Sequence, residues 1–265
     1  MKYIDIHSHL NIAPLTEQQT EIIKKLEELE IGTVTVGVDL ETSHMAVDLA
    51  HKHDFLFATV GQHPNDNPVE VFEYDKYYAL AQHTKVIAIG ECGLDYFRLS
   101  GNVDEITKEK NRQKELFFKH IELAKNVDKP LMIHARPSKG TMDAYEDVLE
   151  ILENHTSSVP ANFHFFVGDV AIVERALKLD STFSFDGPIT FTTEYDEVIK
   201  HIPLTHIHIE TDAPFAAPVP YRGQTNYPYY APHIVQKIAE VKNIDEEEIR
   251  LQLLKNFERF FKVNL

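Results

Sequence analysis

The sequence contains a single cysteine, Cys92, among its 265 residues. One cysteine cannot form an internal disulfide, and no Cys-x-x-Cys pair is present that could hold a structural zinc ion. Any metal ion that this chain binds must therefore be held by histidine and carboxylate side chains, which the sequence offers as 15 His and 42 Asp and Glu.

Long hydrophobic runs are also missing, since no stretch approaches the length of a membrane span. Near the amino terminus, Asp5 and His7 lie where a secretory signal peptide would need an uninterrupted apolar segment. We therefore expect a soluble, cytoplasmic protein that does not associate with membranes. No feature of the sequence predicts an obligate protein partner.

Basic residues are few, with 26 Lys and Arg against 42 Asp and Glu, which gives a formal net charge of −16. A molecule of this charge repels a polyanion as a whole, which argues against a protein that coats DNA. It does not exclude an enzyme that holds one phosphate at a strand end, because bound cations can dominate the field inside a pocket.

No linker, repeat or low-complexity segment divides the chain, so we expect one domain over residues 1–265. Eight short β-branched or apolar runs alternate with segments of helical periodicity. The clearest helices are expected at 15–30 and 108–127. The strands are expected at 3–7, 33–38, 55–60, 86–91, 130–134, 162–166, 182–186 and 206–211.

Eight strands that alternate with helices over about 250 residues predict an α/β fold, a (β/α)8 TIM barrel. A doubly wound open sheet is the alternative. That fold usually carries a glycine-rich phosphate loop after its first strand, whereas this chain has His7-Ser8-His9-Leu10 there.

Polar residues follow nearly every predicted strand. Because a β/α barrel places its active site at the carboxyl ends of the strands, these residues are expected to meet at one mouth. A single His-x-His pair or a lone buried histidine is more often incidental. Several such residues at the same end of one barrel are more informative than any one of them, because clustered imidazoles and carboxylates need a cation to offset their desolvation. The candidate ligands are His7, His9, Glu91, His134, His164 and Asp212.

Four imidazoles and two carboxylates exceed the three protein ligands that one catalytic zinc ion needs. The donor set therefore predicts two divalent ions, with Glu91 between them and a water held by both as the nucleophile. Asp212 is expected to bind one ion and to accept the proton of that water. These donor types accept zinc, manganese, nickel and magnesium alike.

The motifs together resemble the TatD-type metal-dependent deoxyribonucleases of the amidohydrolase superfamily. The likeness extends from His7 to the segment Asn256-Phe257-Glu258-Arg259-Phe260-Phe261. Its motifs are His7-Ser8-His9, Gly61-Gln62-His63-Pro64, Gly90-Glu91-Cys92-Gly93-Leu94-Asp95-Tyr96, Pro130-Leu131-Met132-Ile133-His134-Ala135-Arg136, His164-Phe165-Phe166-Val167-Gly168 and Glu210-Thr211-Asp212-Ala213-Pro214.

The resemblance implies a barrel of the metallo-dependent hydrolase type with two divalent ions per chain, which can be zinc, magnesium or manganese. One ion would lie on His7, His9, Glu91 and Asp212, and the other on Glu91, His134 and His164. The implied activity is that of a 3′-to-5′ exonuclease on single-stranded or damaged DNA. Two further residues would contact the scissile or neighbouring phosphate, namely His63 and Arg136.

One segment departs from the family pattern. Where members often carry a basic pair and a glutamate after the last strand, this chain has Tyr227 in place of the glutamate, followed by Tyr229 and Tyr230. These rings could stack on an exposed base, as aromatic residues do in single-strand binders. They could equally pack against the barrel rim, because rings with a polar tip suit partly buried loops.

Two other residues are interpreted as structural. His208 shares a strand face with Glu210 and Asp212 but lies deeper, so we expect a hydrogen-bonded interior histidine. Cys92 is expected to be a small buried side chain, because no nearby pattern of His or Lys would lower the pKa of its thiol.

The sequence leaves three functions open. The first is hydrolysis of phosphodiester bonds at a DNA end. The second is hydrolysis of another bond by the same centre, such as a lactone, a small phosphoester or an aminoacyl ester on tRNA, because metal ions polarise carbonyl and phosphoryl oxygens alike. The third is a barrel that binds nucleic acid or a protein without turnover.

Overall fold

The computed structural model describes residues 1–65, 71–155 and 159–265. Eight parallel strands follow one another around a single sheet in chain order. The strands are β1 (Tyr3–Ser8), β2 (Ile31–Val36), β3 (Leu56–Val60), β4 (Val86–Asp95), β5 (Leu131–Arg136), β6 (Ala161–Phe163), β7 (Thr182–Phe185) and β8 (Ile207–Ile209).

The sheet closes between its first and last strands. Ser8 pairs in parallel with Ala213, and two backbone bonds join the same segments, from His9 N to Ala213 O at 2.7 Å and from Asp212 N to His7 O at 2.9 Å. The (β/α)8 barrel expected from the sequence is therefore confirmed, and the open sheet is excluded.

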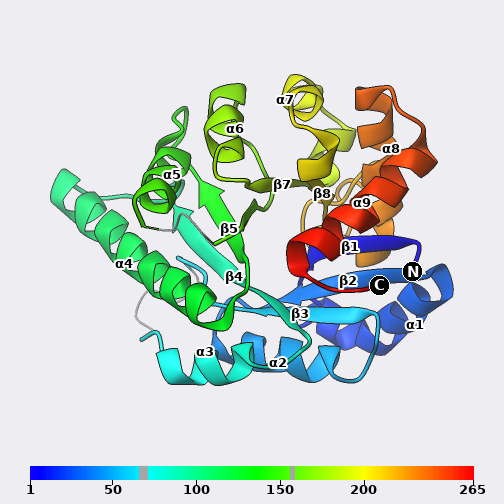
Figure 1. Cartoon of the computed structure of the whole chain (residues 1–265), viewed down its shortest axis with the longest axis horizontal. Helices are drawn as coiled ribbons and strands as arrows, with labels where there is room; N and C mark the ends of the chain where they lie inside the picture. Colours follow the sequence, from blue (N-terminus) through cyan, green and yellow to red (C-terminus); the bar gives the residue numbers. More distant parts are fainter. Residues whose placement is uncertain (66–70, 156–158) are drawn as a thin grey trace.

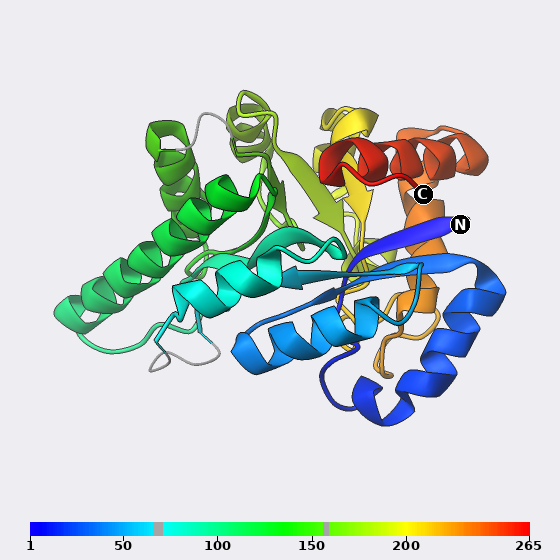
Figure 2. The same cartoon turned by 60° about the horizontal axis from the view of Figure 1, so that its bottom comes forward.

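Helices surround the barrel on its outside (Figures 1 and 2). The α-helices are α1 (Gln19–Leu29), α2 (Leu40–Ala50), α3 (Tyr74–Ala81), α4 (Val103–Val127), α5 (Asp143–His155), α6 (Val170–Leu177), α7 (Asp196–His201), α8 (Ala231–Lys242) and α9 (Glu246–Phe261). Short 3-10 helices are η1 (Leu15–Gln18), η2 (Gly187–Thr190), η3 (Leu204–His206) and η4 (Pro228–Tyr230). Among the described residues, no helix is long and apolar enough to cross a membrane.

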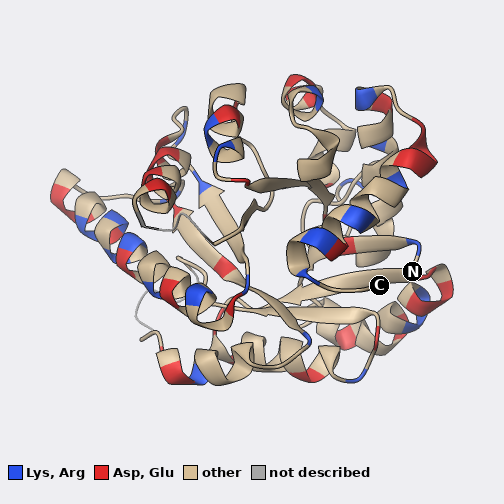
Figure 3. Ribbon diagram, viewed as in Figure 1, with Lys and Arg blue, Asp and Glu red and all other residues tan. Residues whose placement is uncertain are grey.

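The long helix α4 begins five residues before the predicted start, because a capping box fixes its first turn. The side chain of Asn102 accepts a hydrogen bond from Glu105 N at 3.0 Å, and the Glu105 carboxylate accepts one from Asn102 N at 2.9 Å. This arrangement satisfies two backbone donors that a helix start otherwise leaves free. Acidic and basic residues are interspersed along the ribbon of α4 in Figure 3, which is typical of a helix with a solvent-exposed face.

Strand β4 extends to Asp95, four residues past its predicted end, and two glycines make this possible. A Cβ atom on Gly93, whose φ is +130°, would lie 2.2 Å from the carbonyl oxygen of His134. One on Gly90 would lie 2.5 Å from the carbonyl oxygen of Met132. Only glycine permits β4 and β5 to approach this closely.

Strands β6 and β8 are shorter than predicted, because residues just beyond them leave the extended conformation. Phe165 has a φ of 44° and Asp212 a φ of 50°, both in the left-handed region. Such backbone is uncommon outside glycine and often occurs at functional sites. Both residues lie at the carboxyl end of the barrel.

The opposite end of the barrel is closed by α9. Phe257, Phe260 and Phe261 form a buried cluster with Ile4 and Ile6 of β1 and with apolar residues of the next strands. In both views the two termini lie close together on this side of the molecule (Figures 1 and 2). The cavity of the described residues lies at the other end, at the carboxyl ends of the strands, where a β/α barrel has its active site.

Candidate metal centre

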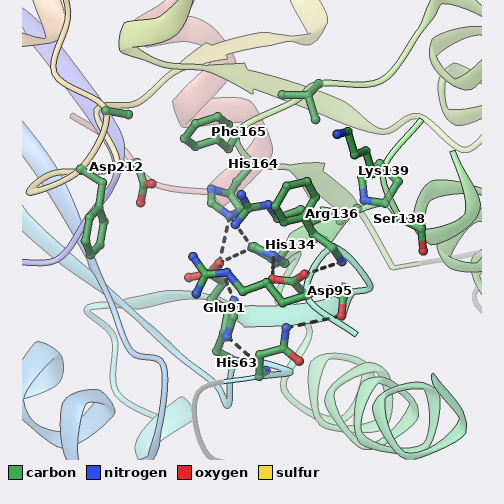
Figure 4. Close-up of a pocket in the computed structure, with 18 of the residues that line it drawn as sticks. His63, Glu91, Asp95, His134, Arg136, Ser138, Lys139, His164, Phe165 and Asp212 are labelled. Atoms are coloured by element: carbon green, nitrogen blue, oxygen red, sulfur yellow. Dashed lines mark hydrogen bonds and ion pairs between the residues drawn. The ribbon is translucent and has the colours of Figure 1, made fainter. Parts of the chain in front are cut away.

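All six candidate ligands converge at the mouth of the barrel. Figure 4 labels four of them, namely Glu91, His134, His164 and Asp212. They come from different strands and from the turns that follow them. Their positions are His7 in β1, His9 just after it, Glu91 in β4, His134 in β5, His164 one residue past β6 and Asp212 three residues past β8.

The first group of donor atoms surrounds the end of β1. The Nε2 atoms of His7 and His9 lie 3.3 Å apart. Asp212 Oδ1 lies 3.3 Å from His9 Nε2 and 3.7 Å from His7 Nε2. Glu91 Oε2 completes the group at 3.5 Å from His7 Nε2. Four donor atoms therefore face a common point.

The second group lies on the other side of Glu91. Its Oε1 atom is 2.8 Å from His134 Nδ1 and 2.9 Å from His164 Nε2. These two ring nitrogens are 3.3 Å apart. The two carboxylate oxygens of Glu91 therefore face two different sets of imidazoles.

These spacings fit divalent cations. Ligand atoms held about 2.1 Å from one tetrahedral ion lie about 3.4 Å from each other. The two groups have this spread, and within the sets His7, His9, Glu91 and Glu91, His134, His164 all candidate donor atoms lie within 4.8 Å of one another. Nitrogen and carboxylate oxygen donors together suit zinc, manganese and magnesium.

The charges of the site are mutually dependent. Burial alone would raise the pKa of Glu91, but the charges of His164 and His63 and a hydrogen bond with His134 lower it well below its usual value. Burial opposes the charged form of His164 as well, yet Glu91 and Glu210 raise its pKa well above the ordinary value. The buried carboxylates therefore require positive charge beside them, which protons or metal ions can supply.

Glu210 is a buried carboxylate behind the second group. Its Oε1 atom lies 3.2 Å from His164 Nδ1 and accepts a hydrogen bond from Phe165 N at 2.7 Å. Its Oε2 atom accepts one from the Ser184 hydroxyl at 2.5 Å. A carboxylate on the second nitrogen of an imidazole fixes the ring orientation and directs its other nitrogen toward a metal ion.

Asp95 acts in the same way on His134, with Oδ2 at 3.2 Å from His134 Nε2. The ring of His63 lies across that of His134 at 4.5 Å, and His63 Nε2 is 3.7 Å from Glu91 Oε1. The three side chains His63, Asp95 and His134 also form a compact cluster of potential donors. His63 thus lies at the centre itself rather than at its edge.

Asp5 is a fully buried carboxylate that joins the two ends of the closed sheet. It accepts hydrogen bonds from His7 N at 3.2 Å, Thr33 Oγ1 at 3.0 Å, Thr211 N at 2.8 Å and Thr211 Oγ1 at 2.9 Å. Burial raises its pKa to about 8, although these hydrogen bonds oppose the shift. Through His7 and Thr211, Asp5 fixes the backbone that carries two candidate ligands.

Asp5, Asp95 and Glu210 are the residues of the site to which the sequence analysis assigned no role. A signal for them existed, because Asp5 precedes His7 by two positions, Glu210 precedes Asp212 by two and Asp95 follows Glu91 by four. In a strand, residues separated by an even number point to the same side. Which of them would reach an imidazole depends on strand register, which the pattern alone does not give.

The candidate centre lies at the floor of a cavity of about 1060 Å³. His63 and Arg136, the two residues that the family resemblance assigned to phosphate, both line this cavity. Tyr227, Tyr229 and Tyr230 are not among the described residues that line it. The rings of Tyr227 and Tyr229 stack on each other at 5.0 Å, so packing at the rim is the interpretation that the structure favours.

The two residues interpreted as structural are both buried. Cys92 is free and fully buried, and burial raises the pKa of its thiol well above the usual value. His208 lies inside the molecule against Phe260 and Phe261 of α9. The expectation of a hydrogen bond was wrong for its Nε2 atom, which has no partner among the described residues because apolar rings surround it.

Comparisons with known proteins agree with this geometry. The family described as TatD related DNase matches residues 4–262 of the chain. The chain belongs to this family. A relative from Bacillus subtilis named an uncharacterized metal-dependent hydrolase, YabD, is 38% identical over 98% of this chain and 99% of its own length. The family assignment made from the motifs is thereby confirmed.

Solved structures have the same architecture. YJJV, a TatD homolog from Escherichia coli, superposes with a TM-score of 0.85 at 25% identity and covers 99% of both chains. An uncharacterized amidohydrolase from Saccharomyces cerevisiae superposes with a TM-score of 0.74 at 17% identity over 98% of this chain and 99% of its own, a likeness of fold alone. Together, the family and the clustered donors identify this chain as a metal-dependent hydrolase of the TatD family.

Proposed function

We propose that this protein is a deoxyribonuclease that removes nucleotides from a 3′ end of DNA, with two divalent ions per chain. The observation that carries the proposal is the position of Glu91. One of its oxygens lies 2.8 Å from His134 and 2.9 Å from His164, and the other lies 3.5 Å from His7. A single carboxylate between two sets of imidazoles is suited to join two cations.

His7, His9 and Asp212 would hold the first ion together with Glu91. His134 and His164 would hold the second with the same glutamate. When bound, such a pair of ions supplies a water of lowered pKa and polarises a phosphoryl oxygen. Zinc, magnesium and manganese all suit this donor set.

Asp212 is the candidate proton acceptor. Its Oδ1 atom contacts His9 Nε2 at 3.3 Å, while its backbone turns into the left-handed region and directs the carboxylate over the mouth. A carboxylate beside a water nucleophile can take up the proton that the attack releases. His63 and Arg136 line the cavity beside the centre and would hold the oxygens of the phosphate.

A nuclease assay tests the proposal. Purified protein is incubated with single-stranded and double-stranded oligonucleotides labelled at the 5′ end, in the presence of each divalent ion. We expect stepwise shortening from the 3′ end that depends on metal and is lost in Asp212→Asn. Wild-type protein loaded with metal that leaves both substrates intact would contradict the proposal.

A panel of a lactone, carboxylic esters, an aminoacyl ester and small phosphoesters addresses the alternative chemistry. If kcat/KM for carbonyl substrates exceeds that for DNA by orders of magnitude, the protein is a hydrolase of carbonyl compounds that uses the same centre, and not a nuclease. Cytoplasmic location stays a prediction from the sequence.

A further inference from the structure

The cavity over the candidate centre has two unlike walls. The end of β5 and the loops after β4 and β5 supply one wall, which carries Arg98, Arg136 and Lys139. The turns after β1 and β8 supply the other, where Phe215 lies near the candidate ligands His9 and Asp212 and no Lys or Arg lines the cavity among the described residues. In Figure 4, Asp212 and Lys139 lie on opposite sides of the imidazole cluster. A ligand over the centre therefore meets positive charge on one side and an aromatic ring on the other.

The cationic side chains of the first wall have no acidic partner among the described residues. Arg98 and Lys139 are exposed, and neither they nor Arg136 form an ion pair with any residue that the structure describes. The whole chain carries a net charge of −16, so acidic partners are abundant elsewhere on its surface. Three unpaired cations that face one cavity are suited to bind a polyanion, because guanidinium and ammonium groups bind phosphate oxygens.

Two parts of this cationic wall, the backbone beside Lys139 and the guanidinium of Arg136, are held in place before any ligand arrives. The Asp143 carboxylate accepts hydrogen bonds from Ser138 N and Ser138 Oγ, both at 2.8 Å, which fixes the residue next to Lys139. The guanidinium of Arg136 lies 4.2 Å from the ring centre of Phe97. A preorganised site loses less conformational freedom when a ligand binds.

Phe215 on the second wall is an exposed ring on a fixed backbone. Its side chain is 55% exposed. Its N–H donates to Asp212 O at 2.8 Å, and its carbonyl oxygen accepts from Asn226 Nδ2 at 2.7 Å, with Asn226 fully buried. The ring lies 6.2 Å from that of His9. A large apolar ring held toward solvent beside candidate metal ligands is suited to stack on a flat partner.

We propose that the cavity binds the end of a nucleic acid strand across these two walls. The base at the cleaved end stacks on Phe215, while Arg98 and Lys139 hold phosphates that neighbour the scissile one. This inference rests on the proposed nuclease function. It predicts that the enzyme prefers a nucleic acid strand with at least one phosphate beyond the cleaved bond over an isolated phosphodiester.

The first test compares two substrates with the same metal ion. An eight-residue thymidine oligonucleotide offers bases and further phosphates, whereas bis(p-nitrophenyl) phosphate offers only the diester. We expect Phe215→Leu to lower the ratio of kcat/KM between strand and small diester by about 5- to 150-fold, the range for loss of one base stacking contact. Phe215→Tyr keeps the ring and should retain the ratio.

The chain offers a matched control outside the cavity. Arg222 lies over the ring of Phe191 at 4.2 Å, the same separation as between Arg136 and Phe97. Neither control residue is among the described residues that line the cavity. Phe191→Leu and Arg222→Gln should therefore leave the substrate ratio at its wild-type value.

The second test measures binding without turnover. A fluorescent oligonucleotide is titrated with metal-loaded protein that carries Asp212→Asn, at several salt concentrations, and its anisotropy gives Kd. For single strands, each phosphate contact adds about 0.7 to the slope of log Kd against log salt. The additional pair Arg98→Gln and Lys139→Gln should lower that slope by about 1.4, and Arg222→Gln should not change it.

The outcomes separate the two proposals. Wild-type protein that hydrolyses the small diester but never the strand would refute the nuclease function. Wild-type protein that cleaves the strand, with an unchanged substrate ratio in Phe215→Leu and an unchanged salt slope in the double variant, would overturn the two-wall site alone. Circular dichroism and thermal unfolding of every variant check that each protein is folded.

Discussion

The two ends of this barrel are built from opposite kinds of residue. At the carboxyl ends of the strands, buried imidazoles and carboxylates face one another around Glu91. At the other end, Phe257, Phe260 and Phe261 of α9 form an apolar cluster with the first strands. The first arrangement opposes stability, because buried charges are costly to desolvate, and the second supports it. Chemistry and stability therefore depend on different residues, and substitutions can separate them.

The largest effect is expected at Glu91. Glu91→Gln removes the charge that faces both sets of imidazoles, so we expect kcat/KM on any cleaved substrate to fall by at least about 1000-fold, a loss of about 4 kcal/mol in transition-state stabilisation. The unfolding midpoint in urea should fall moderately, because removing one partner of a buried ion pair is destabilising, although the imidazoles left behind can release their protons. Activity within tenfold of wild type would mean that Glu91 does not join two cations.

The matching substitution at the other end is Phe257→Ala. This side chain is fully buried and packs against Phe57 at 5.4 Å between ring centres. We expect the free energy of unfolding to fall by about 3–5 kcal/mol, with kcat of the remaining folded protein near the wild-type value. Urea titration and initial rates at low temperature measure the two quantities. A selective loss of kcat would show that the two ends are coupled.

Glu210→Gln should have an intermediate effect at the mouth. The carboxylate orients His164 from behind, and loss of such a partner typically lowers metal affinity by about 10- to 100-fold. Competition with a fluorescent chelator measures this affinity directly. The variant should regain activity when the metal concentration is raised, whereas a defect that metal cannot restore would contradict a positioning role.

His208 provides the smallest expected effect, at the closed end. Burial, and to a smaller extent the charges of Arg259 and His206, lower its pKa to about 3. Below about pH 6.5, His208 is therefore protonated in the unfolded state and neutral in the folded state. The free energy of unfolding falls as the pH falls through this range. Between pH 7 and pH 5 this group should remove about 2 kcal/mol from the free energy of unfolding.

In His208→Leu this contribution disappears. The loss of stability between pH 7 and pH 5, measured by urea unfolding, should be smaller in the variant than in wild type by about 2 kcal/mol. Equal pH dependence in the two proteins would mean that His208 does not stay neutral in the folded state.

The position of the candidate ligands at the ends of the strands explains why the sequence could predict them. Ligands such as His7, Glu91 and Asp212 follow apolar strands directly, and a β/α barrel brings all strand ends to one mouth whatever the details of packing. Their convergence therefore follows from topology alone, together with motifs that are specific to one family. Strand order follows from the same topology, whereas the clearest helices were predicted from the local periodicity of their apolar residues.

What could not be predicted depends on contacts between segments far apart in the sequence. Asp5 reaches Thr211 across the closure of the barrel, and Asp95 reaches His134 from the neighbouring strand. These pairs require the register of the strands. The early ends of β6 and β8 follow from the left-handed backbone of Phe165 and Asp212, which tertiary contacts at the mouth impose.

Metal stoichiometry tests the central claim most directly. Protein purified with an excess of zinc or manganese, then passed through a desalting column, is analysed by inductively coupled plasma mass spectrometry together with Glu91→Gln. The arrangement around Glu91 predicts two ions per chain in the wild type and fewer than one in the variant. Fewer than one ion in the wild type, or an unchanged content in the variant, would contradict a pair of cations joined by this glutamate.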